Sequence, residues 1–305
     1  MNPIVLYFAS GESLYPGTAI LMLAILISPF LRHRWLLRLR NVATWLALIM
    51  IIMACPPFPW TVDVVFVATF LLWYVATSLS VGRRAQRLAT AFLAALLIVL
   101  SGFELQHRSP PLISGMPSDH LVVIGDSISA GIDPRIPPWP AVMQATTGVR
   151  LKNLSSAGAF MVDALRMSAK VIGRPSCTHR DGGNDLLAGV PSVQFGRSLD
   201  TILQKVVAPG RTVVMFELPL LPDRIAYGQI QRQLAKKYGV WLIPKRYFTC
   251  VIGGANATLD GLHLLPEGTG RTASLVAQVL APVLKSTCSW ALSPKPAFSY
   301  SLCAG

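Results

Sequence analysis

The sequence predicts an α/β fold with a parallel sheet covered by helices on both faces, preceded by about four membrane-spanning helices. Two observations predict this division. The 305 residues are 52% hydrophobic and only 13% charged, whereas an average soluble protein is roughly 25% charged, and the deficit is concentrated in the first third of the chain. After residue 118, short β-rich runs alternate with helical patterns, which is typical of βαβ units.

Four long apolar segments make up the N-terminal region, and each approaches the roughly 20 residues that a helix needs to cross about 30 Å of hydrocarbon. They are 14–31, 42–58, 62–81 and 89–103. The first lacks a preceding basic stretch and is followed by three more, so it is not typical of a cleaved signal peptide. Residues 1–103 are therefore predicted to form a membrane region, in which Asp63 is expected to be an interfacial residue.

Basic residues are distributed unevenly among the connections between these segments. The first and third connections carry Arg32, Arg34, Arg38, Arg40, Arg83, Arg84 and Arg87, whereas the second connection and the N-terminus carry none. Because cytoplasmic loops carry the excess of Lys and Arg, both termini are predicted to lie outside the cytoplasm. We expect a multi-pass protein of the cytoplasmic membrane whose second half faces the periplasm or the exterior.

The formal net charge of +13 does not indicate a protein that binds nucleic acid. About a quarter of the Lys and Arg residues fall in the two basic connections, and the others are scattered without interleaved aromatic residues. Attraction to anionic lipid headgroups is a more natural use of this charge, which makes the lipid bilayer an expected partner. The five cysteines show no CxxC or paired spacing, and their odd number argues against a complete disulfide framework.

Residues 104–118 are polar and rich in proline, and are predicted to link the membrane region to the second half. Strands are predicted there at 120–125, 149–154, 211–217 and 239–243, with a further strand running into residue 182. Helices are predicted at 138–147, 160–171, 192–207, 224–238 and 265–285. Open parallel sheets place their sites at the carboxyl ends of the strands, so the residues that follow each strand are the candidates for function.

The first strand ends in Gly125-Asp126-Ser127. The glycine allows a sharp turn, after which Ser127 would be exposed at the carboxyl edge of the sheet. An ordinary turn with a helix-capping serine is the alternative interpretation of these residues. A nucleophilic serine would also need a base within hydrogen-bond reach and a group that orients this base.

Only His263, among five histidines, suits the role of that base. Asp260 precedes it by three residues, a spacing that lets a carboxylate hold the imidazole tautomer while the other ring nitrogen faces the serine. A solvated turn is the alternative for this segment. Two other histidines, His33 and His107, lie in or beside the predicted membrane region. His120 and His179 are expected at the amino ends of strands, which places His120 about 20 Å from the serine.

Two further segments offer donors for a developing oxyanion, Ser-Ala-Gly-Ala at 156–159 and Gly-Gly-Asn-Asp at 182–185. In chain order, GDSIS, SSAGA, GGNDLL and DGLH resemble the motifs of the SGNH (GDSL) hydrolase family, over about residues 119–285, and imply a hydrolase domain at 119–287. The resemblance implies Ser127 as nucleophile and His263 as general base, oriented by Asp260. It also implies an oxyanion hole formed by the N–H groups of Ser127 and Gly158 and the side chain of Asn184.

The same resemblance implies a flavodoxin-like three-layer α/β/α sandwich, with no metal and no cofactor. Residues 217–244 are similar to the arylesterase, lysophospholipase and acyl-thioesterase branch of the family, and no G-x-S-x-G, HExxH or P-loop motif occurs. We expect a membrane-anchored serine esterase that cleaves lipid-like, aryl or thioester acyl substrates. An O-acetylesterase acting on an exported polysaccharide and a catalytically impaired binding module are the alternatives. Residues 288–305 are expected to be a C-terminal tail.

The sequence departs from the family just before GGND, where residues 177–181 read Cys-Thr-His-Arg-Asp. A central parallel strand covered on both faces should be nearly continuous in Val, Ile and Leu. One set of codons that encodes these five residues, TGC-ACT-CAT-CGA-GAT, gives Ala-Leu-Ile-Glu when it is read one base later, which suggests a compensated pair of frame errors. Resequencing the gene tests this hypothesis, since other codons in an active protein would exclude it. If the residues are real, we expect a weakened strand, a poorly placed Asn184 and reduced activity.

Overall fold

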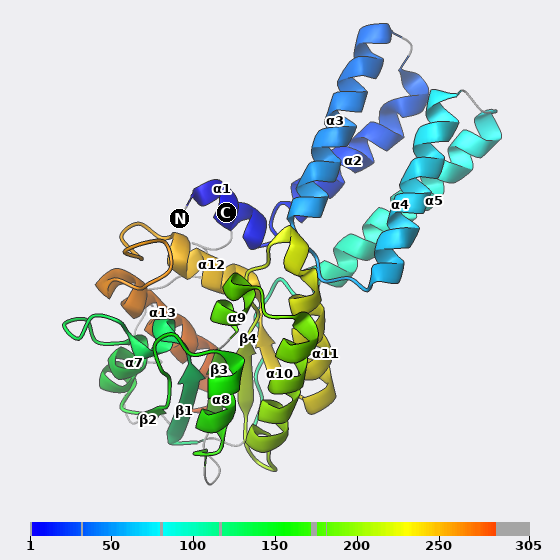
Figure 1. Cartoon of the computed structure of the whole chain (residues 1–305). Helices are drawn as coiled ribbons and strands as arrows, with labels where there is room; N and C mark the ends of the chain where they lie inside the picture. Colours follow the sequence, from blue (N-terminus) through cyan, green and yellow to red (C-terminus); the bar gives the residue numbers. More distant parts are fainter. Residues whose placement is uncertain are drawn as a thin grey trace. The chain divides into compact units, whose positions relative to one another are not determined.

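The computed structural model describes residues 2–31, 33–79, 82–115, 118–171, 176–180 and 182–284, with the backbone alone for 176–180. The chain divides into two compact units (Figure 1). We call the first the α/β unit; it comprises residues 1–6, 110–220 and 226–305. The second, the helical unit, comprises residues 7–109 and 221–225. Each is described by itself.

The helical unit is built from the apolar helices α2 (Leu14–Ile27), α3 (Arg34–Met53), α4 (Trp60–Ser78) and α5 (Arg83–Leu105), with a short 3₁₀ helix, η1 (Ser28–Phe30), after α2. Within the described residues, α3, α4 and α5 are long and apolar enough to cross a membrane. Helix α1 (Pro3–Ala9) is bent by 77° from α2 and η1, and the pair counts as a fourth span only if it is taken as one broken helix. Three to four apolar helices thus precede the α/β sheet, which fits the predicted membrane region.

Two of these helices begin earlier than the sequence predicts. Helix α3 starts at Arg34 and α5 at Arg83, so most of the arginines expected in connections form the first turns of helices. Arginine is a good helix former, and its long stem can cover apolar surface while the guanidinium reaches a polar partner. Arg40 is buried in this way: its Nη1 donates to Oγ of Ser28 at 2.8 Å, and its guanidinium lies 5.9 Å from the ring centroid of Trp73.

A five-stranded, wholly parallel sheet forms the centre of the α/β unit, with strand order β2-β1-β3-β4-β5. The strands are β1 (His120–Gly125), β2 (Arg150–Asn153), β3 (Ser176–Arg180), β4 (Val213–Phe216) and β5 (Trp241–Ile243). This is the flavodoxin-like order, in which the strand sequence reverses beside β1. The predicted fold class is confirmed.

Helices cover both faces of the sheet (Figure 1). On one face, α7 (Trp139–Thr147), α12 (Lys245–Gly253) and α13 (Pro266–Leu280) share an apolar core with alternate residues of β1 and β4, among them Leu121 and Phe216. On the other face α8 (Met161–Ser168) packs against α10 (Ser192–Val206), which contacts α11 (Ile225–Tyr238). Shorter helices are α6 (Ser127–Ala130), α9 (Gly183–Ala188), η2 (Pro222–Arg224) and η3 (Ala281–Val283).

The predicted strands and the five predicted helices occur at nearly the expected bounds, but the α-helices α6, α9 and α12 of the α/β unit were not predicted. The prediction that His179 precedes a strand is wrong, because it lies within β3, opposite Ile124 of β1. Residues 176–180 pair through the backbone with both β1 and β4, and such pairing does not require apolar side chains. Their side chains, and Asp181, lie outside what the structure describes, so the frame hypothesis stays a prediction.

Candidate active site

The carboxyl ends of the central strands bring three of the four predicted motifs together. The loop after β2 bonds to the end of β1, because the N–H of Ser156 donates to the carbonyl of Gly125 at 3.1 Å. A Cβ placed on Gly183, at the start of α9, would lie 3.2 Å from Oδ2 of Asp126. The segments 125–127, 156–159 and 182–185 are therefore neighbours at one edge of the sheet, as the parallel topology predicts.

Ser127 is held on a tight turn directly after β1. A Cβ on Gly125 would lie 2.6 Å from Oγ of Ser129 and 2.9 Å from Oγ of Ser155, so only glycine fits this close approach. The side chain of Asp126 accepts a hydrogen bond from the N–H of Ile128 at 3.0 Å and thereby caps α6. Ser127 is the first residue of α6 and is only 8% exposed, so the expectation that it would be exposed is wrong. The turn thus fixes the backbone of Ser127 before any substrate is bound.

Three hydrogen-bond donors lie in the segments beside this serine. The main-chain N–H groups of Ser127 and Gly158 have no acceptor within the described part of the chain. Nδ2 of Asn184 donates to the carbonyl of Ala159 at 2.8 Å, which places this amide next to the loop that carries Gly158. One amide hydrogen remains for another acceptor. These are the donor types that stabilise an oxyanion in acyl transfer.

The fourth motif forms a closed turn between α12 and α13. Nδ1 of His263 lies 2.6 Å from Oδ2 of Asp260, while Oδ1 of Asp260 accepts from the N–H groups of Leu262 and His263 at 3.0 and 2.9 Å. The main-chain N–H of His263, then its ring, and then the N–H of Leu262 hold the pKa of Asp260 well below its usual range. An ionised carboxylate at this distance places the proton of the ring on Nδ1 and leaves Nε2 as an acceptor.

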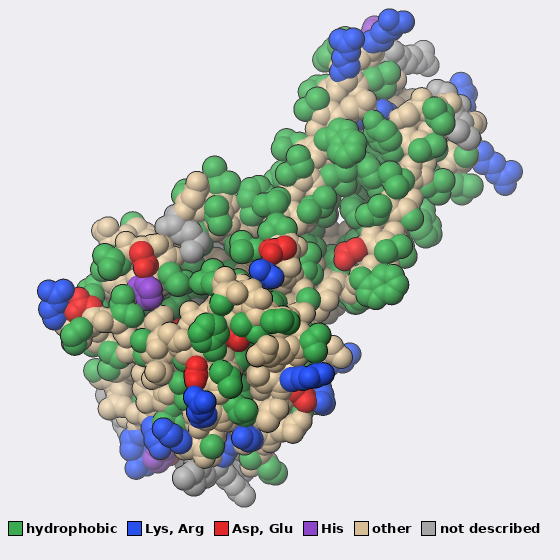
Figure 2. Space-filling view, viewed as in Figure 1, with side chains coloured by type: hydrophobic (Ala, Val, Ile, Leu, Met, Phe, Trp, Pro, Cys, Tyr) green, Lys and Arg blue, Asp and Glu red, His purple; other side chains and the backbone are tan. Residues whose placement is uncertain are grey.

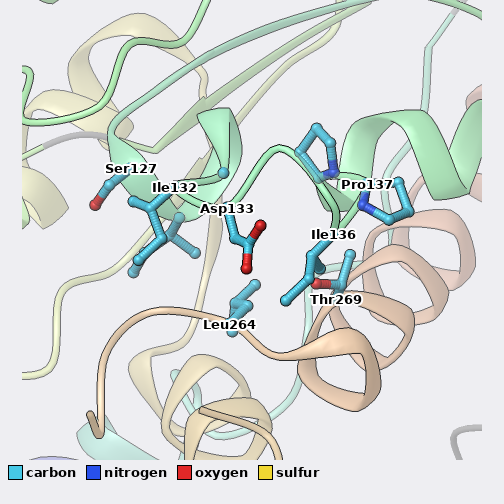
Figure 3. A pocket seen from close by; sticks show the side chains of 10 residues that line it. Ser127, Ile132, Asp133, Ile136, Pro137, Leu264 and Thr269 are labelled. Carbon is cyan, nitrogen blue, oxygen red and sulfur yellow. The ribbon is translucent and has the colours of Figure 1, made fainter. Parts of the chain in front are cut away.

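Ser127 lines a pocket together with Leu264, the residue that follows His263 (Figure 3). Its other walls come mainly from the loop after α6, which supplies apolar side chains and one carboxylate: Ile132, Asp133, Ile136, Pro137 and Pro138. Thr269 of α13 also lines it. In the described residues Ser127 and His263 are not hydrogen-bonded to each other. Catalytic hydrogen bonds are often long in ligand-free enzymes and tighten when a substrate is bound.

Two aspartates of the motifs have structural tasks that the sequence analysis missed. Asp126 caps α6, as described above. Asp185 is buried, and its Oδ2 accepts from the N–H of Met161 at 2.9 Å, which ties the start of α8 to α9. Burial raises the pKa of Asp185. The signal for both was present, since each acidic residue stands beside a predicted site residue in GDS or GGND.

The placement of His120 agrees with its exclusion from the site. It begins β1 at the amino edge of the sheet, where its Nδ1 lies 2.8 Å from Oδ1 of Asp119 and both side chains are about half exposed.

The sequence analysis also missed the loop after α6 that forms part of the pocket, because its apolar residues carry no recognisable motif.

Comparison with curated proteins finds the esterase TesA of Pseudomonas aeruginosa, which is 28% identical over 181 residues, 54% of this chain and 89% of TesA. Among solved structures, a crystal structure of TesA is 27% identical and aligns over 54% of this chain and 99% of that chain, with a TM-score of 0.48. AlinE4, an SGNH-hydrolase family esterase, is 20% identical over 57% of this chain and 100% of its own, with a TM-score of 0.41. No family model matches the chain.

The sequence likeness to TesA agrees with the order of the four motifs and with the flavodoxin-like sheet that carries them. The chain belongs to the SGNH hydrolase family, with a region of three to four apolar helices before the sheet, and is a hydrolase that acts on ester bonds.

Proposed function

We propose that the chain is a membrane-anchored serine esterase that hydrolyses acyl esters outside the cytoplasm, with Ser127 as nucleophile and His263 as general base, oriented by Asp260. One observation carries the proposal. Asp260 fixes the ring of His263 from Nδ1, and the residue after this histidine lines the same pocket as Ser127. A serine, a base and a carboxylate that orients the base are the parts that nucleophilic acyl transfer needs.

In the first step, Oγ of Ser127 bonds to the acyl carbon while its proton passes to Nε2 of His263. The charge that develops on the carbonyl oxygen is met by the N–H groups of Ser127 and Gly158 and by the amide of Asn184, which have hydrogens to offer. The imidazolium then gives its proton to the leaving alcohol or thiol. Water, deprotonated by the same imidazole, releases the acid and restores Ser127.

Anchoring is supported by the helices that are long and apolar enough to cross a membrane. Leu6, near the N-terminus, packs in the α/β unit with Ile128 and Phe248, so the N-terminus belongs on the same side of the membrane as the hydrolase fold. A membrane region that starts and ends on the same side needs an even number of spans, which favours counting α2 as the fourth. The arginines at the starts of α3 and α5 favour cytoplasmic positions for those ends.

A disulfide supports the same sidedness. Cys250, in α12 of the α/β unit, is disulfide-bonded, and such bonds persist in oxidising compartments and are rare in the cytosol. A hydrolase unit exposed to the periplasm or the exterior fits this chemistry.

The test is hydrolysis of p-nitrophenyl esters, from acetyl to palmitoyl, by the purified full chain. Ser127→Ala and His263→Ala should each remove nearly all activity, because the triad acts as a unit. Asn184→Ala should lower kcat by about 10²- to 10³-fold and leave a measurable remainder. His120→Ala, at the opposite edge of the sheet, is the matched control and should retain the activity.

The same panel separates the alternatives. Cleavage confined to acetyl esters would favour an O-acetylesterase, while the absence of activity from a folded chain would favour a binding module. Full activity in Ser127→Ala would end the esterase proposal altogether.

A further inference from the structure

Beyond residue 118, exposed apolar side chains in the α/β unit gather at the edge of the sheet that carries the candidate site; before it, Ile4, Val5 and Leu112 of this unit are also exposed. Beyond residue 118 in this unit, the large hydrophobic side chains described as exposed are Ile132, Val162, Leu187, Val193 and Leu259, at 48%, 51%, 61%, 64% and 71%. Each follows the carboxyl end of a strand or precedes His263: Leu187 lies in the short helix α9, and the others lie in a loop or near the start of a helix. We call these five residues the apolar rim.

The opposite edge has a different composition. Lys170 follows α8, Lys205 lies in the last turn of α10, and Lys236 and Lys237 lie in the last turn of α11. All four are exposed. Figure 2 shows Lys and Arg side chains gathered at this end of the α/β unit, where α8 and α10 finish. Exposed apolar side chains scattered singly are normal on soluble proteins, but this segregation onto one edge is not.

The N-terminal segment ties this edge to the first apolar helix of the chain. Leu6 is 8% exposed and packs with Ile128, the neighbour of Ser127, and with Phe248 and Ile252 of α12. A Cβ on Gly253 would lie 3.0 Å from Cδ1 of Leu6. Only residues 7–13 separate Leu6 from the start of α2 at Leu14, and a fully extended chain of that length spans at most roughly 28 Å.

We propose that the apolar rim is a lipid-binding surface that contacts the outer face of the membrane holding the chain's own helices, and that the hydrolysed acyl esters are delivered from that bilayer. The short tether keeps the edge that contains Leu6 within reach of the lipid. Leu and Val side chains lose contact with water when they enter the interfacial layer, which favours this edge over the lysine-bearing one. The lipid contact stands without the proposed esterase function; the source of the substrate rests on it.

The contact is tested on the full chain reconstituted in phosphatidylcholine vesicles. A nitroxide is attached to Leu259→Cys or Val193→Cys, and to Lys170→Cys as the matched control, with the signal of the unsubstituted chain subtracted. Collision with oxygen, which concentrates in lipid, is compared with collision with a water-soluble nickel chelate. The rim labels should favour oxygen several-fold more than the Lys170→Cys label. Equal, water-like values at all three positions would overturn the proposal.

Activity tests the delivery of substrate separately. In the variant Leu187→Ser/Val193→Ser/Leu259→Ser, hydrolysis of a palmitoyl ester dissolved in the vesicles should fall by at least roughly ten-fold, while hydrolysis of soluble p-nitrophenyl acetate should be retained. The control variant Lys170→Ser/Lys205→Ser/Lys236→Ser should match the wild type on both esters. Loss in the lysine variant instead would contradict a lipid contact through the rim. If the wild type hydrolysed neither ester, the esterase function and the delivery of substrate would be refuted, and the spin-label result would stand.

Discussion

Replacing Asp260 by asparagine should reverse the tautomer of His263 while preserving the turn that carries it. The carboxylate fills three acceptor positions: Oδ1 accepts from the N–H groups of Leu262 and His263, and Oδ2 lies 2.6 Å from Nδ1 of the ring. Asparagine has a single side-chain oxygen. If this oxygen keeps the two main-chain bonds, the amide N–H faces Nδ1 and the ring must carry its proton on Nε2, where a general base has to accept one.

The size of the expected loss of kcat follows from the second possible orientation of the asparagine amide. Turning the oxygen toward Nδ1 restores the productive tautomer but forfeits two main-chain hydrogen bonds, each worth about 0.5–1.5 kcal/mol at a half-exposed neutral acceptor. A penalty of about 1–3 kcal/mol leaves roughly 5- to 150-fold fewer productive molecules. Loss of the negative charge beside the imidazolium adds to this effect, so kcat should fall by about 10²-fold or more.

The assay is the steady-state hydrolysis of p-nitrophenyl butyrate by the detergent-solubilised full chain, with kcat and KM determined separately. We expect kcat to fall and KM to change little, because Asp260 acts on the base and not on the bound ester. Asp119→Asn is the matched control, since Asp119 also lies 2.8 Å from Nδ1 of a histidine, but at the amino edge of the sheet. Retention of more than half of kcat in Asp260→Asn, or an equal loss in Asp119→Asn, would refute the reasoning.

Three further predictions concern stability and topology. Because burial raises the pKa of Asp185, the stability it contributes is present below its unfolded pKa and is lost as the pH rises through the folded value. Asp185→Asn should therefore equal or exceed the wild type in thermal midpoint at pH 7 and lose any advantage in acid. Asp185→Ala should lower the free energy of unfolding by about 1–3 kcal/mol, because the N–H of Met161 loses its acceptor. An asparagine variant less stable than the wild type at pH 7 would disprove this. Glu217→Ala should lower the free energy of unfolding, measured by chemical denaturation, by about 3–5 kcal/mol, because the Glu217 side chain is 1% exposed and lies 2.7 Å from Nε of Arg232. An unchanged midpoint would show that this ion pair is dispensable. Alkaline phosphatase fused after Ser118 should be active outside the cytoplasm, and activity of a cytoplasmic reporter there instead would reverse the proposed topology.

Most of the sheet could be predicted because its strands carry their own signal. The run Leu121 to Ile124 is continuously apolar, as a strand covered on both faces requires, and the structure buries all of it. The polar segment 176–180 has no such signal, yet it pairs with β1 and β4, so its place in the sheet is set by its neighbours and not by its own residues.

Part of the candidate site could likewise be predicted from the sequence, and part of it could not. Asp260 and His263 lie on one turn, so their spacing alone predicted that they would meet, and their contact at 2.6 Å agrees. The packing of Leu6 beside Ile128 could not be predicted, because it joins residues far apart in the chain and no periodic pattern encodes such a contact. The pocket wall formed by residues 131–138 was missed for a related reason, since it is an irregular loop.

The measurement that most directly tests the central claim is covalent labelling of the full chain with a fluorophosphonate, followed by mass spectrometry of its peptides. Attack by an activated serine forms a bond to phosphorus and expels fluoride, and it requires the folded site with its base. We predict a single adduct on Ser127 in the reconstituted chain, with little or none in His263→Ala or after heat denaturation. A folded, active chain that forms no adduct at Ser127, or one in which Ser127→Ala is labelled to the same extent, would contradict the assignment of this residue as the nucleophile.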